Sequence, residues 1–167
     1  MEIVLKPIGV VRHRYSDDEV KNSWDGVDGV IEVYPEYVEG LTGIDGFSHL
    51  IIIAYLHKTS EEQRRVLKIK HRRLVRFGID ISDIPEVGVF ASDSPHRPNP
   101  IALTIVELEK RIYNKLYVKK LDLFNETPVL DIKPYTSDRA IADYKVPDWH
   151  RILEERIYSK FGARGPV

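Results

Sequence analysis

A rigid polar corner at residues 93–100 brings together side chains that could do chemistry. The stretch DSPHRPNP holds three prolines within six residues, which fix their own backbone angles and extend the residues before them. His96, Arg97 and Asn99 supply a titratable ring, a forked cationic donor and an amide that both donates and accepts. A corner ordered in advance suits a binding loop, although the same side chains could instead cap backbone groups of a structural turn.

Two further polar groups, His57 and Lys58, end the largely apolar stretch FSHLIIIAYLHK at residues 47–58. Its continuous apolar run is typical of a strand buried on both faces. The end of such a strand would deliver both side chains to the edge of a sheet. Taken alone, His57 could equally be a satisfied histidine at the rim of the core. The pattern predicts a polar pocket near this pair and the corner.

Strands must position these groups, and apolar runs predict them along most of the chain. They lie at residues 3–15, 30–34, 47–58, 88–92, 101–113 and 115–123, the last two forming a hairpin across Asn114. Because the strands follow one another without long helices between them, the pattern argues against a doubly wound parallel sheet. The pattern indicates a mainly β fold, a closed or partly closed antiparallel β-barrel with a few short helices, over residues 1–137.

Loops and short helices are expected between and after these strands. The polar residues 16–29 are typical of a loop, and PEYVEGL at 35–41 opens with proline and closes near glycine, as a short helix does. Thr127 and Pro128 are typical of a helix start, with Pro134 ending that element. Residues 138–167 are expected to form a loop and an amphipathic C-terminal helix at 147–158, packed on the barrel or extending from it.

Composition excludes several classes of protein. The 167 residues are 43% hydrophobic and 31% charged, with a net charge of −1, as in an ordinary globular protein. The absence of cysteine excludes disulfides, thiolate metal sites and a cysteine nucleophile, and the six histidines are scattered, so no metal site is predicted. Without an apolar run of about 18 residues or a signal-peptide pattern, we expect a cytoplasmic protein. P-loop, Rossmann and hydrolase motifs are absent.

One strongly basic segment, QRRVLKIKHRRLVR at residues 63–76, contains seven Lys or Arg residues and no acid. It also contains apolar residues, so it predicts an element with a core side and a cationic side. Such a segment could neutralise several phosphates of a nucleic acid, or it could be a solvated face with acidic partners elsewhere. The candidate nucleic-acid-binding residues are Arg64, Arg65, Lys68, Lys70, Arg72 and Arg73.

Four motifs in this order make the chain resemble the TsaA-like family, which includes TrmO-type tRNA methyltransferases. They are PIGVVRH (7–13), GIDGFSHLIIIAYLHK (43–58), GVFASDSPHRPNPIALTIVEL (88–108) and TPVLDIKPY (127–135). The resemblance implies a β-barrel methyltransferase, usually homodimeric, that binds S-adenosylmethionine outside the Rossmann plan. It also implies transfer of a methyl group to the exocyclic nitrogen of a threonylcarbamoyl-adenosine beside the anticodon of a tRNA.

The resemblance assigns a cofactor site residue by residue. The family's pair after the F-S-H strand corresponds to His57 and Lys58, its apolar contact after R-P-N-P-I to Leu103, and its D-G-T-P turn in part to residues 125–128. Lys21, Asn22 and Ser23 roughly occupy the place of the family's first-loop P-R-Q. The implied cofactor-binding residues are Asn22, Ser23, His57, Lys58, Asp93, Arg97, Asn99, Leu103, Asn125, Glu126, Thr127 and Pro128; no catalytic residue is assigned.

Asp93 departs from the family pattern, which commonly has an arginine at this position. An aspartate would repel a carboxylate or phosphate that an arginine would hold. Asp93 could instead accept hydrogen bonds from ribose hydroxyls or an amino group of the cofactor, it could mark a different substrate, or it could supply a base.

The leading hypothesis is therefore an S-adenosylmethionine-dependent tRNA methyltransferase. The alternatives are a methyltransferase with a non-tRNA acceptor and a non-catalytic module that binds S-adenosylmethionine or RNA. Methyl transfer from a sulfonium is an in-line displacement, so the site works mainly by positioning the reactants.

Overall fold

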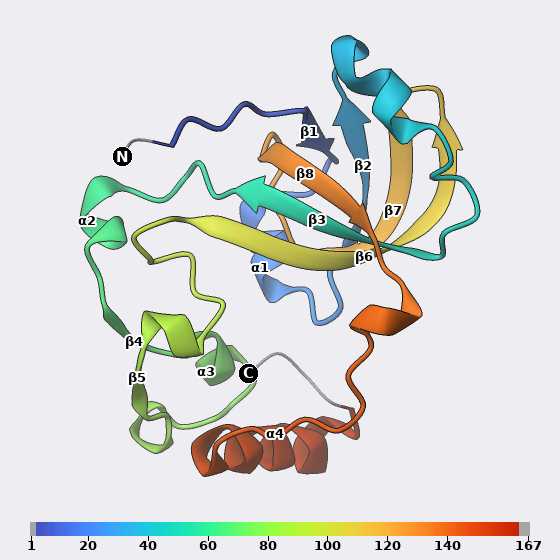
Figure 1. Cartoon of the computed structure of the whole chain (residues 1–167). Coiled ribbons are helices and arrows are strands. Elements are labelled where there is room, and N and C mark those ends of the chain that lie inside the picture. Colours follow the sequence, from blue (N-terminus) through green and yellow to red (C-terminus); the bar gives the residue numbers. More distant parts are fainter. Residues whose placement is uncertain (1–2, 164–167) are drawn as a thin grey trace. The chain divides into compact units, whose positions relative to one another are not determined.

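The computed structural model describes residues 3–163, and these form two compact units (Figure 1). The first unit contains the described residues up to Lys58 together with Ile101–Arg139, and the second contains Thr59–Pro100 together with the described residues from Ala140 onward. The contacts therefore divide the chain differently from the expected boundary between residues 137 and 138, because residues 59–100 group with the C-terminal segment. Among the described residues, none of the helices is both long and apolar enough to cross a membrane.

The first unit is a closed antiparallel barrel, which confirms the predicted fold class. Its strands follow the spatial order β1-β2-β7-β6-β3-β8, and β8 closes the barrel by pairing with β1. β1 is therefore paired on both sides, with β2 and with β8. The strands are β1 (Gly9–Arg12), β2 (Val27–Val33), β3 (His49–Tyr55), β6 (Ile101–Ile112), β7 (Lys115–Leu121) and β8 (Pro128–Pro134).

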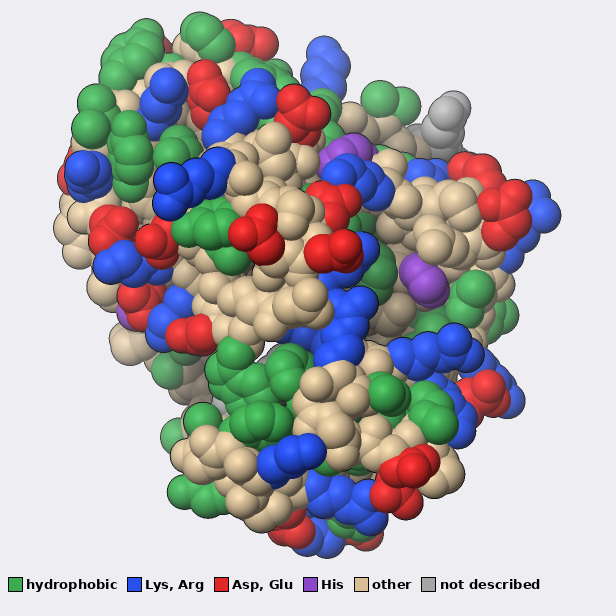
Figure 2. Space-filling view, turned by 180° about the vertical axis from the view of Figure 1, so that it is seen from behind, with side chains coloured by type: hydrophobic (Ala, Val, Ile, Leu, Met, Phe, Trp, Pro, Cys, Tyr) green, Lys and Arg blue, Asp and Glu red, His purple; other side chains and the backbone are tan. Residues whose placement is uncertain are grey.

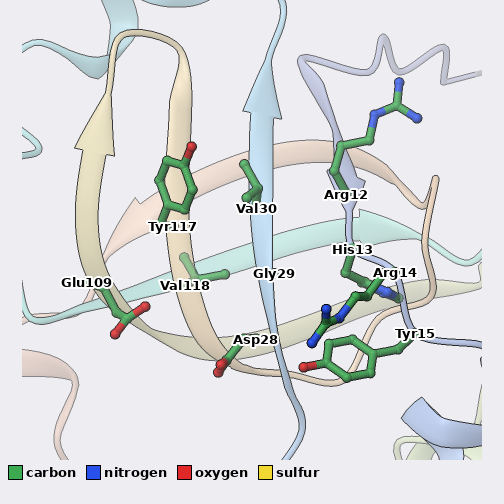
Figure 3. Close-up of a pocket in the computed structure, with 10 residues that line it drawn as sticks. All are labelled: Arg12, His13, Arg14, Tyr15, Asp28, Gly29, Val30, Glu109, Tyr117 and Val118. Carbon is green, nitrogen blue, oxygen red and sulfur yellow. The ribbon is translucent and has the colours of Figure 1, made fainter.

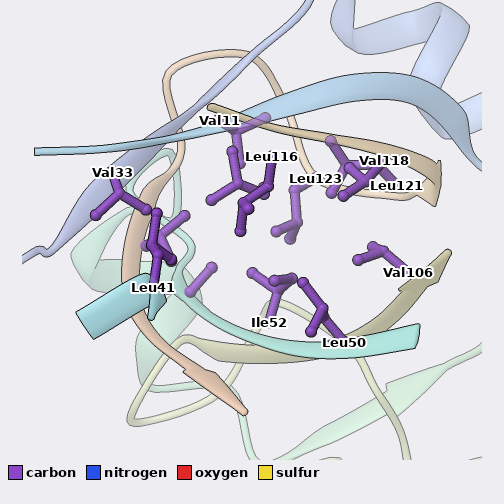
Figure 4. Close-up of a cluster of buried hydrophobic side chains, with 13 residues drawn as sticks. Val11, Val33, Leu41, Leu50, Ile52, Val106, Leu116, Val118, Leu121 and Leu123 are labelled. Carbon is purple, nitrogen blue, oxygen red and sulfur yellow. The ribbon is translucent and has the colours of Figure 1, made fainter. Parts of the chain in front are cut away.

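The inward-facing side chains of these strands form one apolar core (Figure 4). Alternation along β3 explains the choice of residues, because Leu50 and Ile52 point inward and have no exposed surface. Full burial of each such side chain contributes about 2 kcal/mol, so this core holds the barrel together. Its members are Val11, Ile31, Val33, Leu41, Leu50, Ile52, Ala54, Val106, Leu116, Val118, Leu121, Leu123 and Val129.

The prediction of a loop at residues 16–29 is wrong, because this segment contains helix α1 (Asp17–Asn22) near its start. Ser16 caps this helix: its hydroxyl accepts from the backbone N–H of Glu19, and the Glu19 carboxylate accepts from the backbone N–H of Ser16 at 2.8 Å. This reciprocal pair is a capping box, which the spacing Ser-x-x-Glu encodes. The expected short helix at 35–41 is the 3-10 helix η1 (Pro35–Leu41).

The expected helix start at Thr127 and Pro128 is also wrong, because residues 128–134 form strand β8. A proline at the first position of a strand loses no ladder hydrogen bond that the strand needs, so it suits a strand start as well as a helix start. Asp131 and Lys133 consequently share one face of a strand, and their side chains form an ion pair of 2.7 Å.

The second unit is built from short elements. The expected buried strand at 88–92 is wrong: β5 ends at Gly88, a 3-10 turn follows, and the Phe90 side chain is 83% exposed. The predicted amphipathic C-terminal helix is confirmed as α4, which buries Leu153 and Ile157. The remaining elements are α2 (Glu61–Arg64), β4 (Lys68–Lys70), α3 (Arg73–Arg76), η2 (Ile81–Asp83), β5 (Glu86–Gly88), η3 (Val89–Ala91) and α4 (Asp148–Phe161), while η4 (Ser137–Arg139) belongs to the first unit.

Candidate functional site

The turn that follows β3 carries His57 and Lys58, as the sequence predicts, and α1 lies against it. The Lys58 ammonium group donates to both carboxylate oxygens of Asp17, at 2.8 and 2.6 Å. Asp17 is the first residue of α1, so the capping box at Ser16 fixes the position of its carboxylate by fixing the start of the helix. Charge-assisted hydrogen bonds to both oxygens fix the direction of the ammonium group better than a single contact would.

An aromatic ring lies beside this ion pair. The ammonium nitrogens of Lys58 and Lys21 lie 5.2 and 5.3 Å from the centroid of the Phe124 ring. Cations at this distance are attracted by the electrons of the ring face. Segments far apart in the sequence, namely α1, the turn after β3 and the turn after β7, therefore converge on one cationic and aromatic surface of the barrel unit.

His57 is uncharged at neutral pH in this setting. Partial burial is the main cause that lowers the pKa of His57 below its ordinary value of 6.5, and the adjacent Lys58 charge lowers it further. Asp17 and Glu126 oppose this shift without reversing it. The imidazole is consequently a neutral group beside a lysine, able both to donate and to accept a hydrogen bond.

The turn at residues 125–128 is joined to β1 through its backbone. The amide oxygen of Asn125 accepts from the backbone N–H of His13 at 3.0 Å, and the backbone N–H of Glu126 donates to the Val11 carbonyl at 2.8 Å. Glu126 has a φ of 66°, a left-handed conformation that is uncommon for a residue with a side chain. Thr127 is buried, so the turn presents Glu126 outward while Thr127 anchors it.

Three other predicted residues also lie in the barrel unit. Asn22 is the exposed last residue of α1, and the hydroxyl of Ser23 donates to the Gly26 carbonyl at 2.5 Å. Leu103 lies on the outer face of β6 opposite Ile53, with 65% of its surface exposed. The structure therefore places Asn22, Ser23, His57, Lys58, Leu103 and residues 125–128 in one unit.

The remaining three predicted cofactor residues, Asp93, Arg97 and Asn99, belong to the second unit. The Arg97 guanidinium group donates to the Val89 carbonyl at 2.6 Å and also to the Ser92 carbonyl. Arg97 thus ties the corner to η3, the 3-10 turn that precedes it. Asn99 is exposed. A part in cofactor binding stays a prediction for all three residues.

Asp93 lies near a histidine that the sequence did not connect with it. Burial is the main cause that lowers the pKa of His71 below its ordinary value of 6.5, and His150 lowers it further, whereas the Asp93 charge acts in the opposite direction. The His71 ring also contacts Trp149 of α4, with 5.6 Å between the ring centroids. In the second unit the charge of Asp93 therefore acts on a histidine that is mainly neutral at neutral pH.

The basic segment does not form one continuous element. It is divided among α2, β4 and α3, and the Arg64 guanidinium group pairs with Glu61 at 3.0 Å. On the face of the molecule that Figure 2 shows, Lys and Arg side chains are interspersed with Asp and Glu side chains. Nucleic-acid binding by Arg64, Arg65, Lys68, Lys70, Arg72 and Arg73 stays a prediction.

Asp17 and Phe124 are parts of the site that the sequence interpretation missed. Asp17 could have been found from the Ser16-x-x-Glu19 capping box, which predicts a helix with an acidic first turn. Phe124 carried no such signal, because an aromatic residue between a strand and a turn is as typical of core packing as of a surface site.

The fold and the site define a β-barrel protein with a cationic, aromatic surface site beside β3. Comparison with known proteins identifies its family. The family model of the tRNA-methyltransferase O N-terminal domain, TrmO_N, matches residues 20–140. A probable S-adenosyl-L-methionine-binding protein of Methanocaldococcus jannaschii is 38% identical over 133 residues, which cover 79% of this chain and 91% of that relative. The chain belongs to the TrmO_N family.

Longer proteins share this region. A tRNA (adenine(37)-N6)-methyltransferase of Rattus norvegicus is 36% identical over 132 residues, which cover 79% of this chain and 26% of the rat protein. A crystal structure of TrmO is similar with a TM-score of 0.65 and 28% identity, over 87% of this chain and 64% of that chain. The chain therefore spans less than two thirds of the TrmO chain.

Proposed function

We propose that this protein is an S-adenosylmethionine-dependent methyltransferase that acts on tRNA. Membership of the TrmO_N family is the observation that carries the proposal. The rat relative named as a tRNA (adenine(37)-N6)-methyltransferase supports an adenine N6 nitrogen as the acceptor. The finer proposal, that this adenosine carries a threonylcarbamoyl group and lies beside the anticodon, follows the family resemblance.

The donor chemistry of the barrel site fits S-adenosylmethionine. Its ammonium groups, on Lys21 and Lys58, suit the carboxylate of the methionine part of the cofactor. The carboxylates of Asp17 and Glu126 suit ribose hydroxyls and the positive sulfonium. Phe124 offers an aromatic surface of the kind that an adenine ring stacks against.

When bound, S-adenosylmethionine supplies an electrophilic methyl group on its sulfonium sulfur. The residues of the chain then act mainly by positioning, since an in-line displacement requires alignment of the acceptor, the methyl group and the leaving sulfur. Asp17 orients the Lys58 ammonium group through two short hydrogen bonds. His57, neutral because of partial burial and Lys58, can accept a hydrogen bond from the N–H of the acceptor without adding another positive charge beside the sulfonium.

We also propose a homodimer formed through the outer face of β6. Ile101, Leu103 and Ile105 all point outward along this strand and are 38%, 65% and 44% exposed. A row of three exposed aliphatic side chains on one strand is typical of a surface that another chain covers. Light scattering of the purified protein measures the mass that tests this proposal.

A second candidate function is a non-catalytic S-adenosylmethionine-binding module. The archaeal relatives favour it, because the Methanocaldococcus jannaschii and Pyrococcus abyssi proteins are both named only as probable S-adenosyl-L-methionine-binding proteins. Asp93 in place of the family's usual arginine is compatible with this function or with a methyltransferase that has a non-tRNA acceptor.

Calorimetry with S-adenosylmethionine, followed by radiolabelled methyl transfer to tRNA with and without the threonylcarbamoyl group, tests the proposal. We expect Lys58→Met to weaken cofactor binding about tenfold or more, because it removes a charge-assisted hydrogen bond to the carboxylate. Lys133→Met is a matched control, since Lys133 is 46% exposed and pairs with Asp131 at 2.7 Å, much as Lys58 is 48% exposed and pairs with Asp17 at 2.6 Å.

These experiments separate the proposed function from its alternatives. Transfer that requires the threonylcarbamoyl group supports the finer proposal, and cofactor binding without transfer to any tRNA supports the binding module or a methyltransferase with a non-tRNA acceptor. Absence of cofactor binding at high micromolar concentration contradicts all three. Both lysine variants should keep their stability within about 1 kcal/mol, since exposed ion pairs contribute little.

A further inference from the structure

A second site lies on the barrel, in an open groove of about 370 Å³ across β1, β2 and β7 (Figure 3). Figure 3 shows Arg12, Arg14 and Tyr15 on one side of the β2 strand, and Tyr117 with Glu109 on the other. The backbone and side chains of β2 between them form the floor of the groove. None of the residues that line the groove belongs to the predicted cofactor site.

Strand register explains why these side chains form one surface. Arg12 of β1 pairs with Val30 of β2, Val30 pairs with Tyr117 of β7, and Tyr117 pairs with Lys110 of β6. Directly paired residues in a sheet point to the same face. A row of side chains therefore crosses the outside of the barrel on four neighbouring strands. In order, it consists of Arg12, Val30, Tyr117 and Lys110.

Each aromatic ring of the groove has a cation near it. The Arg14 guanidinium carbon lies 5.9 Å from the Tyr15 ring centroid, and the Lys110 ammonium nitrogen lies 5.0 Å from the Tyr117 ring centroid. Aromatic faces stack on nucleobases of any sequence, and neighbouring cations bind the phosphates that link those bases. Rings and cations side by side in this groove thus offer both kinds of contact that a single strand needs.

The acidic side chains of the groove share one cation. Lys119 forms an ion pair with Glu109 at 2.7 Å, and the charge of Asp28 acts on the same lysine. Lys119 therefore offsets part of their repulsion of a phosphate at the arginine wall. Carboxylates near a stacked base can in addition accept hydrogen bonds from its amino group.

We propose that this groove binds a single-stranded segment of the RNA substrate, an inference that rests on the proposed function. The groove adjoins the turn of the cofactor site, because the backbone N–H of His13, which lines the groove, donates to Asn125 at 3.0 Å. A strand held on Tyr15 and Tyr117 thus lies next to the elements that bind the cofactor. Double-stranded RNA is disfavoured, because its paired bases are not free to stack on tyrosine rings.

Fluorescence anisotropy with a labelled eight-nucleotide pyrimidine RNA tests the proposal on the full chain. We expect Tyr117→Leu to weaken RNA binding about tenfold, since stacking on one aromatic residue contributes that much. Arg14→Gln is expected to weaken binding and to lower the slope of log affinity against log salt by about 1, as the loss of one phosphate contact does. The matched controls are Tyr158→Leu and Arg151→Gln, at residues 58% and 52% exposed on α4.

The outcomes separate the groove from the proposed function. Weaker RNA binding by both groove variants, with unchanged affinity for S-adenosylmethionine and unaffected controls, supports the groove. Affinities within twofold of the parent protein overturn it, even where methyl transfer to tRNA is observed. If either variant fails to fold, photocrosslinking of the parent protein to 5-iodouridine RNA decides instead: crosslinks at Tyr15 or Tyr117 support the proposal, and crosslinks confined to residues 63–76 overturn it.

Discussion

The candidate cofactor site of the barrel and the proline corner of the second unit hold their polar groups in opposite ways. At the barrel site, Lys58 and Asp17 pair with each other on the surface, and the ammonium group keeps an exposed side. In the corner, the Arg97 guanidinium group donates hydrogen bonds to two backbone carbonyls, those of Val89 and Ser92. The barrel site is held in place by the strands around it, whereas the corner is held in place by the side chain of Arg97, which had been a candidate ligand-binding residue.

This difference shows what a regular framework makes possible. Backbone groups in β3 and β8 are satisfied by the sheet, so side chains at the strand ends remain available for ligands. The corner has no ladder hydrogen bonds, and its backbone carbonyls need side-chain donors instead. A polar residue in an irregular corner is therefore weaker evidence for a ligand than the same residue beside a strand.

Removing part of the barrel core has the largest expected effect. Ile52→Ala deletes a fully buried side chain and should lower the free energy of unfolding by about 3 to 4 kcal/mol, through lost burial and an unfilled cavity. Urea unfolding measures this change. Ile141→Ala is the control, because Ile141 is 73% exposed and should lose less than about 0.5 kcal/mol. A loss below about 1 kcal/mol in Ile52→Ala would contradict the view that this core supports the site.

Removing the Arg97 side chain shows whether this residue stabilises the corner or binds the cofactor. Arg97→Ala leaves the carbonyls of Val89 and Ser92 without this donor, so the free energy of unfolding should fall by about 2 kcal/mol. Affinity for S-adenosylmethionine should fall much less than in Lys58→Met. Urea unfolding and calorimetry measure the two effects on the same protein.

Arg151→Ala serves as the control for Arg97→Ala, since Arg151 lies in the same unit and pairs only with exposed carboxylates of its own helix. It should cost no more than about 0.5 kcal/mol. The opposite pattern for Arg97, unchanged stability with a tenfold loss of cofactor affinity, would show that the corner binds the cofactor and would remove the contrast with the barrel.

Long elements of the fold were predictable from sequence, and short ones were not. The apolar run of β3, the β6–β7 hairpin and α4 each repeat their pattern often enough for the periodicity to identify them. β8 was mistaken for a helix because Thr-Pro is compatible with both starts, and only its pairing with β1 and β3 decides between them. Residues 61–91 form elements of three or four residues, too short for any period to show.

The site was predictable only in part, for a related reason. His57 and Lys58 end a recognisable strand, so their place followed from that strand. Asp17 depended on a helix that was interpreted as a loop, and Phe124 joined the site only through contacts with two lysines distant in sequence. The groove was not predicted, because the pairing of Arg12, Val30 and Tyr117 depends on the register of three strands.

Acid should weaken the second unit through His71, the smallest of the expected effects. Burial and His150 lower the pKa of His71 in the folded protein below its ordinary value of 6.5, against the pull of Asp93. The unfolded chain therefore binds protons more readily than the folded protein as the pH falls below this value. The stability contribution is present above pH 6.5 and is lost as the pH falls through the lowered pKa.

Melting temperatures measured between pH 7.5 and 5.5 check this expectation. The parent protein should lose a few degrees more than His71→Gln, because glutamine cannot take up the proton. His57→Gln sharpens the comparison between the units: the pKa of His57 is lowered too, but His57 is less buried than His71, so its removal should flatten the profile less. A parent profile no steeper than that of His71→Gln would mean that the charged imidazole is tolerated beside Asp93, and that the aspartate at this position stabilises the protonated histidine.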